Sequence, residues 1–204
     1  TPTFHIEEGV SGILQCEYVG HLNRYNKSYS MDIEIPFNSN LEILVENMGR
    51  INYGSEIVHN NKGIISPVKI DDNLIEGEWE MVKLPMNEVP VFEKMPANTV
   101  TSIVEGDTNA LVHKPSLYKG IFTLQDTGDT FLNMEGWGKG IVFVNGIHIG
   151  RYWQVGPQQT LFVPGIWLKK GVNEIVIFDQ LNEKIRTRIG TVKMPVLTGL
   201  RINK

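Results

Sequence analysis

The sequence predicts an all-β protein, and three observations support this class. The 20 glycines and 10 prolines are spread along the 204 residues without a period, as expected for many short strands joined by turns. Apolar and polar residues alternate over residues 29–36 and 41–46, which is the period of a strand with one buried face. Two apolar runs, 141–144 and 147–153, flank Asn145-Gly146, a dipeptide that favours the type I′ turn of a β-hairpin.

The first predicted domain comprises residues 1–75. Its two period-two segments, Tyr29–Pro36 and Leu41–Glu46, are expected to be strands that each turn one apolar face towards a core. Glu7-Glu8 and Asp71-Asp72 are pairs of adjacent acidic residues, whose side chains diverge in an extended chain. We expect both pairs in turns or at the surface.

The second predicted domain comprises residues 76–204. It is expected to begin with a strand at Glu76–Pro85 and to contain the hairpin around Asn145-Gly146. Between these elements, residues 86–115 carry several prolines and a polar Gly-Asp-Thr-Asn patch, with neither helical nor strand period. This segment is expected to be mostly loop.

Composition excludes several classes of function. The net charge of −4, without a dense cluster of Lys and Arg, removes the electrostatic attraction that dominates nucleic-acid binding. The apolar runs are far shorter than the ~18 residues that cross a bilayer, so we expect no membrane partner. Cys16 is the single cysteine, which excludes an intrachain disulfide and a cysteine-based metal site.

Several motifs resemble those of one enzyme family. Gly-Trp-Gly-Lys-Gly, Val-Asn-Gly, Gly-Arg-Tyr-Trp and Gly-Pro-Gln-Gln-Thr-Leu follow one another within residues 136–161. In this order they resemble the C-terminal jelly-roll domain of the β-galactosidases of glycoside hydrolase family 35. Residues 41–54 are similar to a signature of the first β domain in the same family, and residues 76–85 are similar to the strand that enters its final domain. The resemblance covers nearly the whole chain.

The resemblance implies a truncated first β domain followed by a galactose-binding-like jelly-roll β-sandwich. In the family, a (β/α)-barrel with both catalytic glutamates precedes these domains, and nothing in this sequence resembles it. The chain alone is therefore expected to be inactive and to require a catalytic barrel, upstream or in a partner chain. The implied substrate of the parent enzyme is a galactoside with a terminal β-D-galactosyl residue, and no cofactor is implied. One departure is Cys16, where relatives have the glycine of a hairpin turn.

Apart from the resemblance, the residues could form a catalytic pair of carboxylates or a metal site. Glu78 and Glu80 would share one face of a strand about 7 Å apart, as in an inverting glycosidase, but a solvated strand face explains the same pattern. The acidic turn Asp126–Asp129 supplies two carboxylates, fewer than the six to eight oxygens of a calcium site. The five histidines show no ligand spacing. We expect neither a catalytic residue nor a metal ligand.

Aromatic residues are the remaining candidates, because sugars stack their apolar face on aromatic rings while planar polar groups bind the hydroxyls. In the second domain the candidates are Trp137, Tyr152 and Trp153. Tyr152 and Trp153 are consecutive, so a strand directs them to opposite faces and at most one joins the core on that face. Packing in the sandwich core is the alternative role for these rings. Gln158 and Gln159 are expected to fix their loop through backbone hydrogen bonds.

Asn52 and Tyr53 are the candidates in the first domain. In the family, the resembling turn leans towards the mouth of the barrel, so the resemblance places Tyr53 at the border of the substrate. We expect Glu46 and Arg50 to form an ion pair that holds the turn.

Three functions stay open at this stage. The chain is an accessory region that supports a catalytic barrel and borders its entrance, a stand-alone module that binds galactosides weakly, or an inert structural relict. Fold resemblance alone does not choose among them. The compartment is open as well, although the parent family is often secreted or periplasmic.

Overall fold

The computed structural model describes residues 18–23, 25, 27–46, 51–89, 115–181 and 188–197. The chain divides into two compact units, Thr1–Leu84 and Pro85–Lys204. Regular structure in the described residues consists of strands and two short 3₁₀ helices, which confirms the all-β class. None of the helices in these residues has the length and apolar character needed to cross a bilayer.

The described residues of the first unit include the 3₁₀ helix η2 and one small hairpin. The helix, η2, spans Ser55–His59, and strands β1 (Lys69–Ile70) and β2 (Asn73–Leu74) pair antiparallel. Asp71 and Asp72 connect these strands with φ angles of 48° and 64°, the left-handed region that Asp tolerates better than most residues. Their assignment to a turn is therefore confirmed.

The strands predicted at Tyr29–Pro36, Leu41–Glu46 and Glu76–Pro85 are wrong, because the structure has no regular strand in any of them. Alternation of apolar and polar residues predicts which side chains share a face, but a strand also needs a neighbour that satisfies its backbone N–H and C=O groups. No such ladder forms over these three segments. Their apolar side chains remain partly exposed, as the 43% exposure of Ile35 and the 86% exposure of Met81 illustrate.

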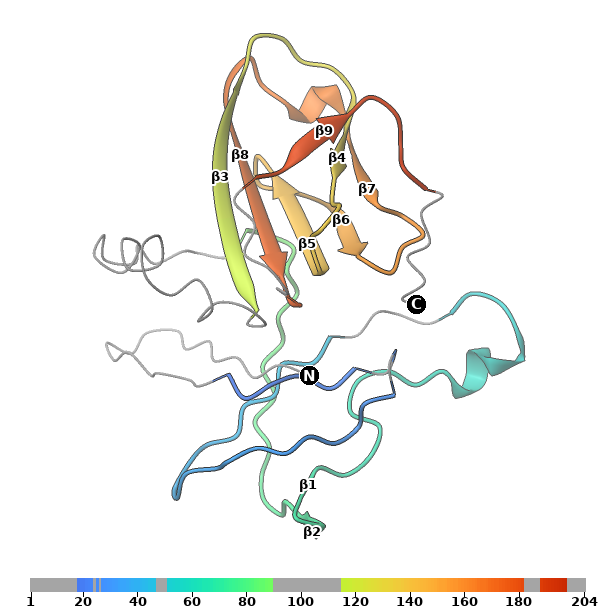
Figure 1. The fold of residues 1–204 in the computed structure, drawn as a ribbon, viewed down its shortest axis with the longest axis vertical. Helices are drawn as coiled ribbons and strands as arrows, with labels where there is room; N and C mark the ends of the chain where they lie inside the picture. The colour runs from blue at the N-terminus through green and yellow to red at the C-terminus, as the bar shows by residue number, and fades with distance from the viewer. Residues whose placement is uncertain are drawn as a thin grey trace. The chain divides into compact units, whose positions relative to one another are not determined.

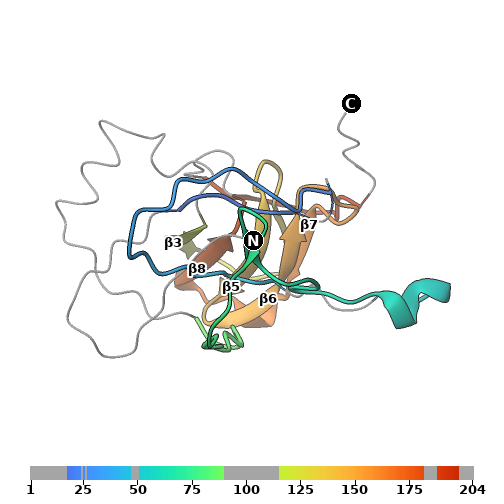
Figure 2. The ribbon, with the colours of Figure 1, turned by 90° about the horizontal axis from the view of Figure 1, so that it is seen from below.

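The second unit is a sandwich of two antiparallel sheets (Figure 1). The four-stranded sheet has the order β3-β8-β5-β6, which is also visible from below in Figure 2. The three-stranded sheet has the order β7-β4-β9. In chain order the elements are β3 (Ser116–Leu124), β4 (Thr130–Asn133), β5 (Lys139–Val144), β6 (Ile147–Trp153), β7 (Thr160–Val163), the 3₁₀ helix η4 (Gly165–Trp167), β8 (Gly171–Asp179) and β9 (Gly190–Val192).

The hairpin predicted at Asn145-Gly146 is confirmed. Val144 pairs with Ile147, and the two turn residues have φ angles of 50° and 84°, as a type I′ turn requires. The Asn145 side chain also joins the turn to β8 and η4. Its Nδ2 donates to the Trp167 carbonyl at 2.7 Å, and its Oδ1 accepts from the Glu174 N–H at 3.0 Å.

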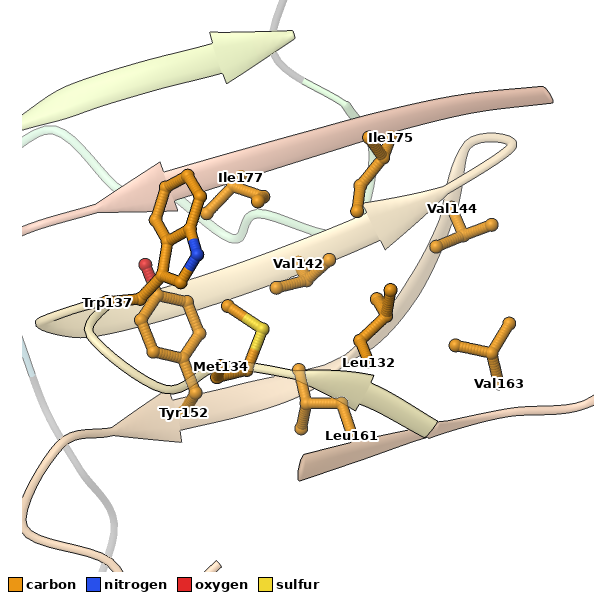
Figure 3. Packing of buried hydrophobic residues seen from close by; sticks show 10 residues of the cluster. All are labelled: Leu132, Met134, Trp137, Val142, Val144, Tyr152, Leu161, Val163, Ile175 and Ile177. Atoms are coloured by element: carbon orange, nitrogen blue, oxygen red, sulfur yellow. The ribbon is translucent and has the colours of Figure 1, made fainter. Parts of the chain in front are cut away.

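The core lies between the two sheets (Figure 3). Val142 and Val144 of β5 and Ile175 and Ile177 of β8 point towards Leu132, Leu161 and Val163 of the opposite sheet. On the other face of the same central strands, Phe143 and Val176 are also buried. Burial on both faces explains why the sequences of β5 and β8 contain continuous apolar runs and not an alternation of apolar and polar residues.

Two glycines allow the chain to approach β8 closely where β5 begins. A Cβ atom on Gly140 would collide with the Phe178 carbonyl, and one on Gly138 would collide with the Leu181 carbonyl. Both obstacles are backbone atoms, which cannot move aside as a flexible side chain can. The spacing of the glycines in Gly136-Trp-Gly-Lys-Gly140 is therefore set in part by steric contact with β8 and with Leu181, which follows it.

We predict that Gly140→Ala destabilises the chain by about 3 kcal/mol or more, because the collision forces β5 away from β8. The matched control is Gly128→Ala, where nothing lies within 4 Å of the added methyl group. That variant should change the free energy of unfolding by less than about 0.5 kcal/mol. Urea denaturation measures both values, and equal effects would contradict the steric role of Gly140.

Candidate functional site

A small pocket lies between two loops at the end of the sandwich where β5 begins and β6 ends. We call it the loop-end pocket. Its lining residues are Met134, Glu135, Trp153, Gln154 and Gln159. The first two belong to the β4–β5 loop and the last two to the β6–β7 loop. The loops are joined by a hydrogen bond from the Met134 N–H to the Gln159 carbonyl at 3.0 Å.

Trp153 is the aromatic residue of this pocket and is partly exposed. It pairs across the hairpin with Lys139, whose Nζ lies 4.8 Å from the centroid of the indole ring. A lysine ammonium at this distance is attracted by the negative face of the ring. The contact restricts the orientation of the indole at the rim of the pocket.

The structure places the other two candidate aromatics of this unit in the core. Trp137 and Tyr152 are each 4% exposed and lie beside Met134 in Figure 3. Trp137 also packs edge-to-face against Tyr118, with ring centroids 5.1 Å apart. Neither ring presents a face to solvent, because both project between the sheets. Among the three residues, only Trp153 is placed where a ligand could reach its ring.

Asp179 lies at this same end of the sandwich. Its carboxylate is buried, and the residue has an exposed fraction of 1%. Its Oδ2 accepts from the Gly138 N–H at 2.9 Å, and its Oδ1 accepts from the N–H groups of Lys139 and Leu181 at 3.2 and 3.0 Å. Burial raises the pKa of Asp179, although these N–H donors favour the charged form. Burial, followed by the nearby Asp179, also raises the pKa of Tyr152 well above its usual range. The carboxylate satisfies backbone donors inside the fold instead of facing a substrate.

Asn52 and Tyr53 of the first unit are exposed, and Tyr53 has an exposed fraction of 89%. They precede Gly54, whose φ of 102° favours glycine, and the Gly54 carbonyl accepts from the Ile57 N–H at 3.3 Å. The turn thus ends where η2 begins. An ion pair was expected between Glu46 and Arg50. Arg50 lies outside the described residues.

The other acidic candidates hold loops or lie at the surface. Asp129 accepts from the Gly165 N–H at 2.8 Å, and Asp126 pairs with Lys170 at 3.0 Å, which lowers the pKa of Asp126. Glu78 and Glu80 are exposed on a segment without strand structure. In the described ranges, no group of three His, Cys, Asp or Glu side chains is arranged to hold a metal ion.

Three other residues named from the sequence have clear positions. The Gln158 amide donates to the Thr160 carbonyl at 3.0 Å, which confirms its role in fixing the loop. His148 is an exposed residue whose ring is partly buried. This burial, followed by the charge of Arg151, lowers the pKa of His148. Cys16 lies outside the described residues, as do Glu7 and Glu8.

Sequence reasoning missed Glu135, Gln154 and Lys139 as neighbours of Trp153. A signal was available for Lys139, because counting back from the Asn145-Gly146 turn places it near the end of β6. Counting alone pairs Lys139 with Tyr152, whereas the structure pairs it with Trp153. The difference is a β-bulge opposite Val142 and Phe143.

Comparison with known proteins identifies both units. The profile of the β-galactosidase first all-beta domain matches residues 6–85, and that of the β-galactosidase galactose-binding domain matches residues 115–173. Beta-galactosidase 17 of Arabidopsis thaliana is 40% identical over 179 residues, covering 82% of this chain and 25% of the relative. Beta-galactosidase-1-like protein 2 of Homo sapiens is 38% identical over 141 residues, covering 69% and 21%. Beta-galactosidase of Xanthomonas manihotis is 33% identical over 146 residues, covering 71% and 22%. The chain thus spans about a quarter of the length of these relatives.

We predict that Asp179 makes the stability of the chain fall as the pH rises above the ordinary pKa of a carboxyl group. Because its pKa is raised in the folded state, the folded protein holds a proton that the unfolded chain has released. This contribution is complete below the unfolded pKa and is lost as the pH rises through the folded pKa. Asp179→Asn should abolish that part of the slope and cost about 1–3 kcal/mol, since an amide offers one acceptor oxygen to three N–H donors.

Chemical denaturation over a series of pH values measures this slope. Asp126→Asn is the control with the opposite sign, because the pKa of Asp126 is lowered by Lys170 and its contribution is lost as the pH falls. If Asp179→Asn left the pH dependence of unfolding unchanged, the raised pKa would be refuted.

Proposed function

The chain belongs to the family 35 β-galactosidases, as their non-catalytic β-domain region, and on this premise we propose that it is an accessory region that supports a catalytic barrel. The parent reaction is hydrolysis of terminal β-D-galactosyl residues. The barrel lies upstream in the same polypeptide or in a partner chain. One observation carries the proposal: the residues that mark the family in this chain are used to build the fold.

Each of these motif residues has a defined structural role. Trp137 fills the core, Gly138 and Gly140 allow close approach to β8, and Asn145 joins the hairpin turn to η4 and β8. Each residue is thus occupied by packing or by hydrogen bonds within the sandwich. Motifs with this use specify a rigid scaffold, which is what an accessory region contributes to a larger enzyme.

The described carboxylates support a non-catalytic role. Glycoside hydrolysis uses two convergent carboxyl groups, roughly 5–5.5 or 6.5–9.5 Å apart, on either side of the scissile bond. Asp179 is enclosed and Glu174 pairs with Lys119 at 2.6 Å. Glu78 and Glu80 lie on an exposed segment without a strand to fix their separation. These environments favour a barrel as the source of the catalytic pair.

We propose further that Asn52 and Tyr53 lie at the entrance of that barrel. The support is an exposed apolar stretch, in which Tyr53 is 89% exposed, Val58 71% and Ile51 39%. Exposed apolar side chains of this kind mark contact surfaces. A tyrosine at such a border offers a ring for stacking and a hydroxyl for hydrogen bonding to a sugar.

A second candidate function is a module that binds galactosides weakly by itself. The observation that favours it is the loop-end pocket, in which the partly exposed ring of Trp153 lies beside carboxylate and amide side chains. An inert relict would require no such pocket.

We predict that the purified chain hydrolyses no chromogenic β-galactoside, because the described carboxylates form no acid and nucleophile pair. The matched variants are Glu78→Gln and Glu80→Gln, which should show the same absence of hydrolysis. Turnover that survives further purification and disappears in either variant would overturn the non-catalytic assignment.

We predict that Tyr53→Ala raises KM in the assembled enzyme with little change in kcat, because a residue at the entrance contributes binding that is equal in the ground and transition states. An increase of about threefold to tenfold corresponds to roughly 0.6–1.4 kcal/mol. The melting temperature of the isolated chain should stay unchanged, since the side chain is exposed. Val58→Ala is the control on the same stretch, and equal effects of both variants on KM would contradict a specific role for Tyr53.

A further inference from the structure

The described residues of the first unit include none that is buried. Every described residue between positions 18 and 84 is exposed or partly exposed, whereas the buried hydrophobic residues of the described part of the chain all lie in the second unit. Burial of apolar side chains is the dominant favourable contribution to folding. The apolar surface of the first unit is therefore still available to a partner.

The clearest part of this surface lies on either side of one turn, in two segments that we call the hairpin arms, residues 29–36 and 41–46. Their alternating apolar residues are Tyr29, Met31, Ile33 and Ile35 in the first arm and Leu41, Ile43 and Val45 in the second. None of these side chains is buried. The turn itself is formed, because Asn38 has a φ of 61° and the Ser39 hydroxyl donates to the Pro36 carbonyl at 2.6 Å. The arms thus have the turn and the side-chain pattern of a β-hairpin.

The hairpin arms form no regular strand, although their pattern is that of strands. A strand needs a neighbour that satisfies its backbone N–H and C=O groups, and an extended peptide that joins as a further strand satisfies them. Such a peptide also covers alternate side chains on one face. A helix or a small ligand would cover the apolar face without completing the backbone pairing. The partner that fits both needs is a β-strand.

The charge of the arms selects the composition of that strand. Residues 29–46 contain four acidic residues, Asp32, Glu34, Glu42 and Glu46, and no Lys or Arg, which gives a formal charge of −4. Asp32 and Glu34 are exposed and alternate with the apolar residues of the first arm. Opposite charges on paired strands attract, whereas like charges directly opposite one another destabilise the pair. A complementary strand therefore alternates apolar residues with Lys or Arg.

We propose that the hairpin arms dock an extended strand in which apolar and basic residues alternate, and that both arms become regular strands on docking. The source of this strand is polypeptide of the β-galactosidase outside these 204 residues, since the chain covers 25% of a relative such as Beta-galactosidase 17. This source rests on the proposed function, whereas the surface and the chemistry of its partner rest on the arms. Strand pairing at the arms would hold the accessory region in the enzyme.

The test is amide hydrogen exchange of the full chain, followed by mass spectrometry, with two synthetic peptides of equal length. One peptide alternates Val and Lys, and the other alternates Val and Glu. The Val-Lys peptide should slow exchange in residues 29–36 and 41–46 about tenfold or more, and the Val-Glu peptide should leave it unchanged. About 1 M salt should weaken the binding, because it screens the charges. Unchanged exchange with the Val-Lys peptide would overturn the proposal, and equal slowing by both peptides would contradict the selection for basic residues.

Two variants of the first arm locate the binding. Asp32→Asn combined with Glu34→Gln should weaken binding of the Val-Lys peptide about threefold to tenfold, because two opposite-charge pairs are lost. Ile35→Ser should weaken it by a similar factor, because apolar contact is lost. The matched control is Ile121→Ser, which changes a 69% exposed residue of β3 and should leave binding unchanged.

The altered residues are exposed or partly exposed, so the variants should keep the melting temperature of the sandwich. Binding that is unchanged in both arm variants would place the peptide elsewhere and overturn the proposal. The accessory role would survive that result, because it is tested by activity with the barrel. Peptide binding at the arms would equally survive a failure of the accessory role.

Discussion

The close contact between the start of β5 and the end of β8 is the constraint on which the rest of the sandwich depends. It needs two conditions at once: glycines at 138 and 140, where a methyl group would collide with backbone carbonyls, and an acceptor for the N–H groups that the approach encloses. Asp179 is that acceptor, and it binds three of these N–H groups from inside the fold. An enclosed N–H without a partner costs about 1–3 kcal/mol, so the carboxylate and the glycines are needed together.

Two separate features determine which aromatic residues are exposed. Trp137 packs between the sheets against Tyr118, and the β-bulge in β6 decides between Tyr152 and Trp153. Ile149 and Tyr152 are an odd number of residues apart, and a regular strand would direct them to opposite faces. The bulge adds one residue to β6, so both point to the core and Trp153 lies on the other face. A single inserted residue thus leaves one tryptophan partly exposed beside Lys139.

The sequence was informative wherever a local rule fixes the geometry. Asn145-Gly146 predicted its turn, because few residues tolerate positive φ angles. Asp71-Asp72 was expected in a turn or at the surface, because the side chains of adjacent residues diverge, and it forms a turn. The strands predicted at residues 29–36 and 41–46 failed because a strand depends on a partner that local alternation does not reveal. For the candidate site, the sequence supplied Trp153 but not its neighbours. Glu135 lies 18 residues before Trp153, and no local pattern joins a loop residue to the end of a strand across a bulge.

The separation of scaffold and surface in this chain explains how one set of motifs can serve a non-catalytic role. A reacting site needs carboxyl groups that are exposed to substrate and held at a fixed separation. The carboxylate held most firmly here, Asp179, is 1% exposed, while Glu78 and Glu80 are exposed on a segment without regular structure. Rigidity and access to solvent come together instead at Trp153, an aromatic side chain, and an aromatic surface can bind a sugar but cannot transfer its protons. The described carboxylates are thus either enclosed or not fixed in position, which agrees with the proposal that hydrolysis belongs to a catalytic barrel.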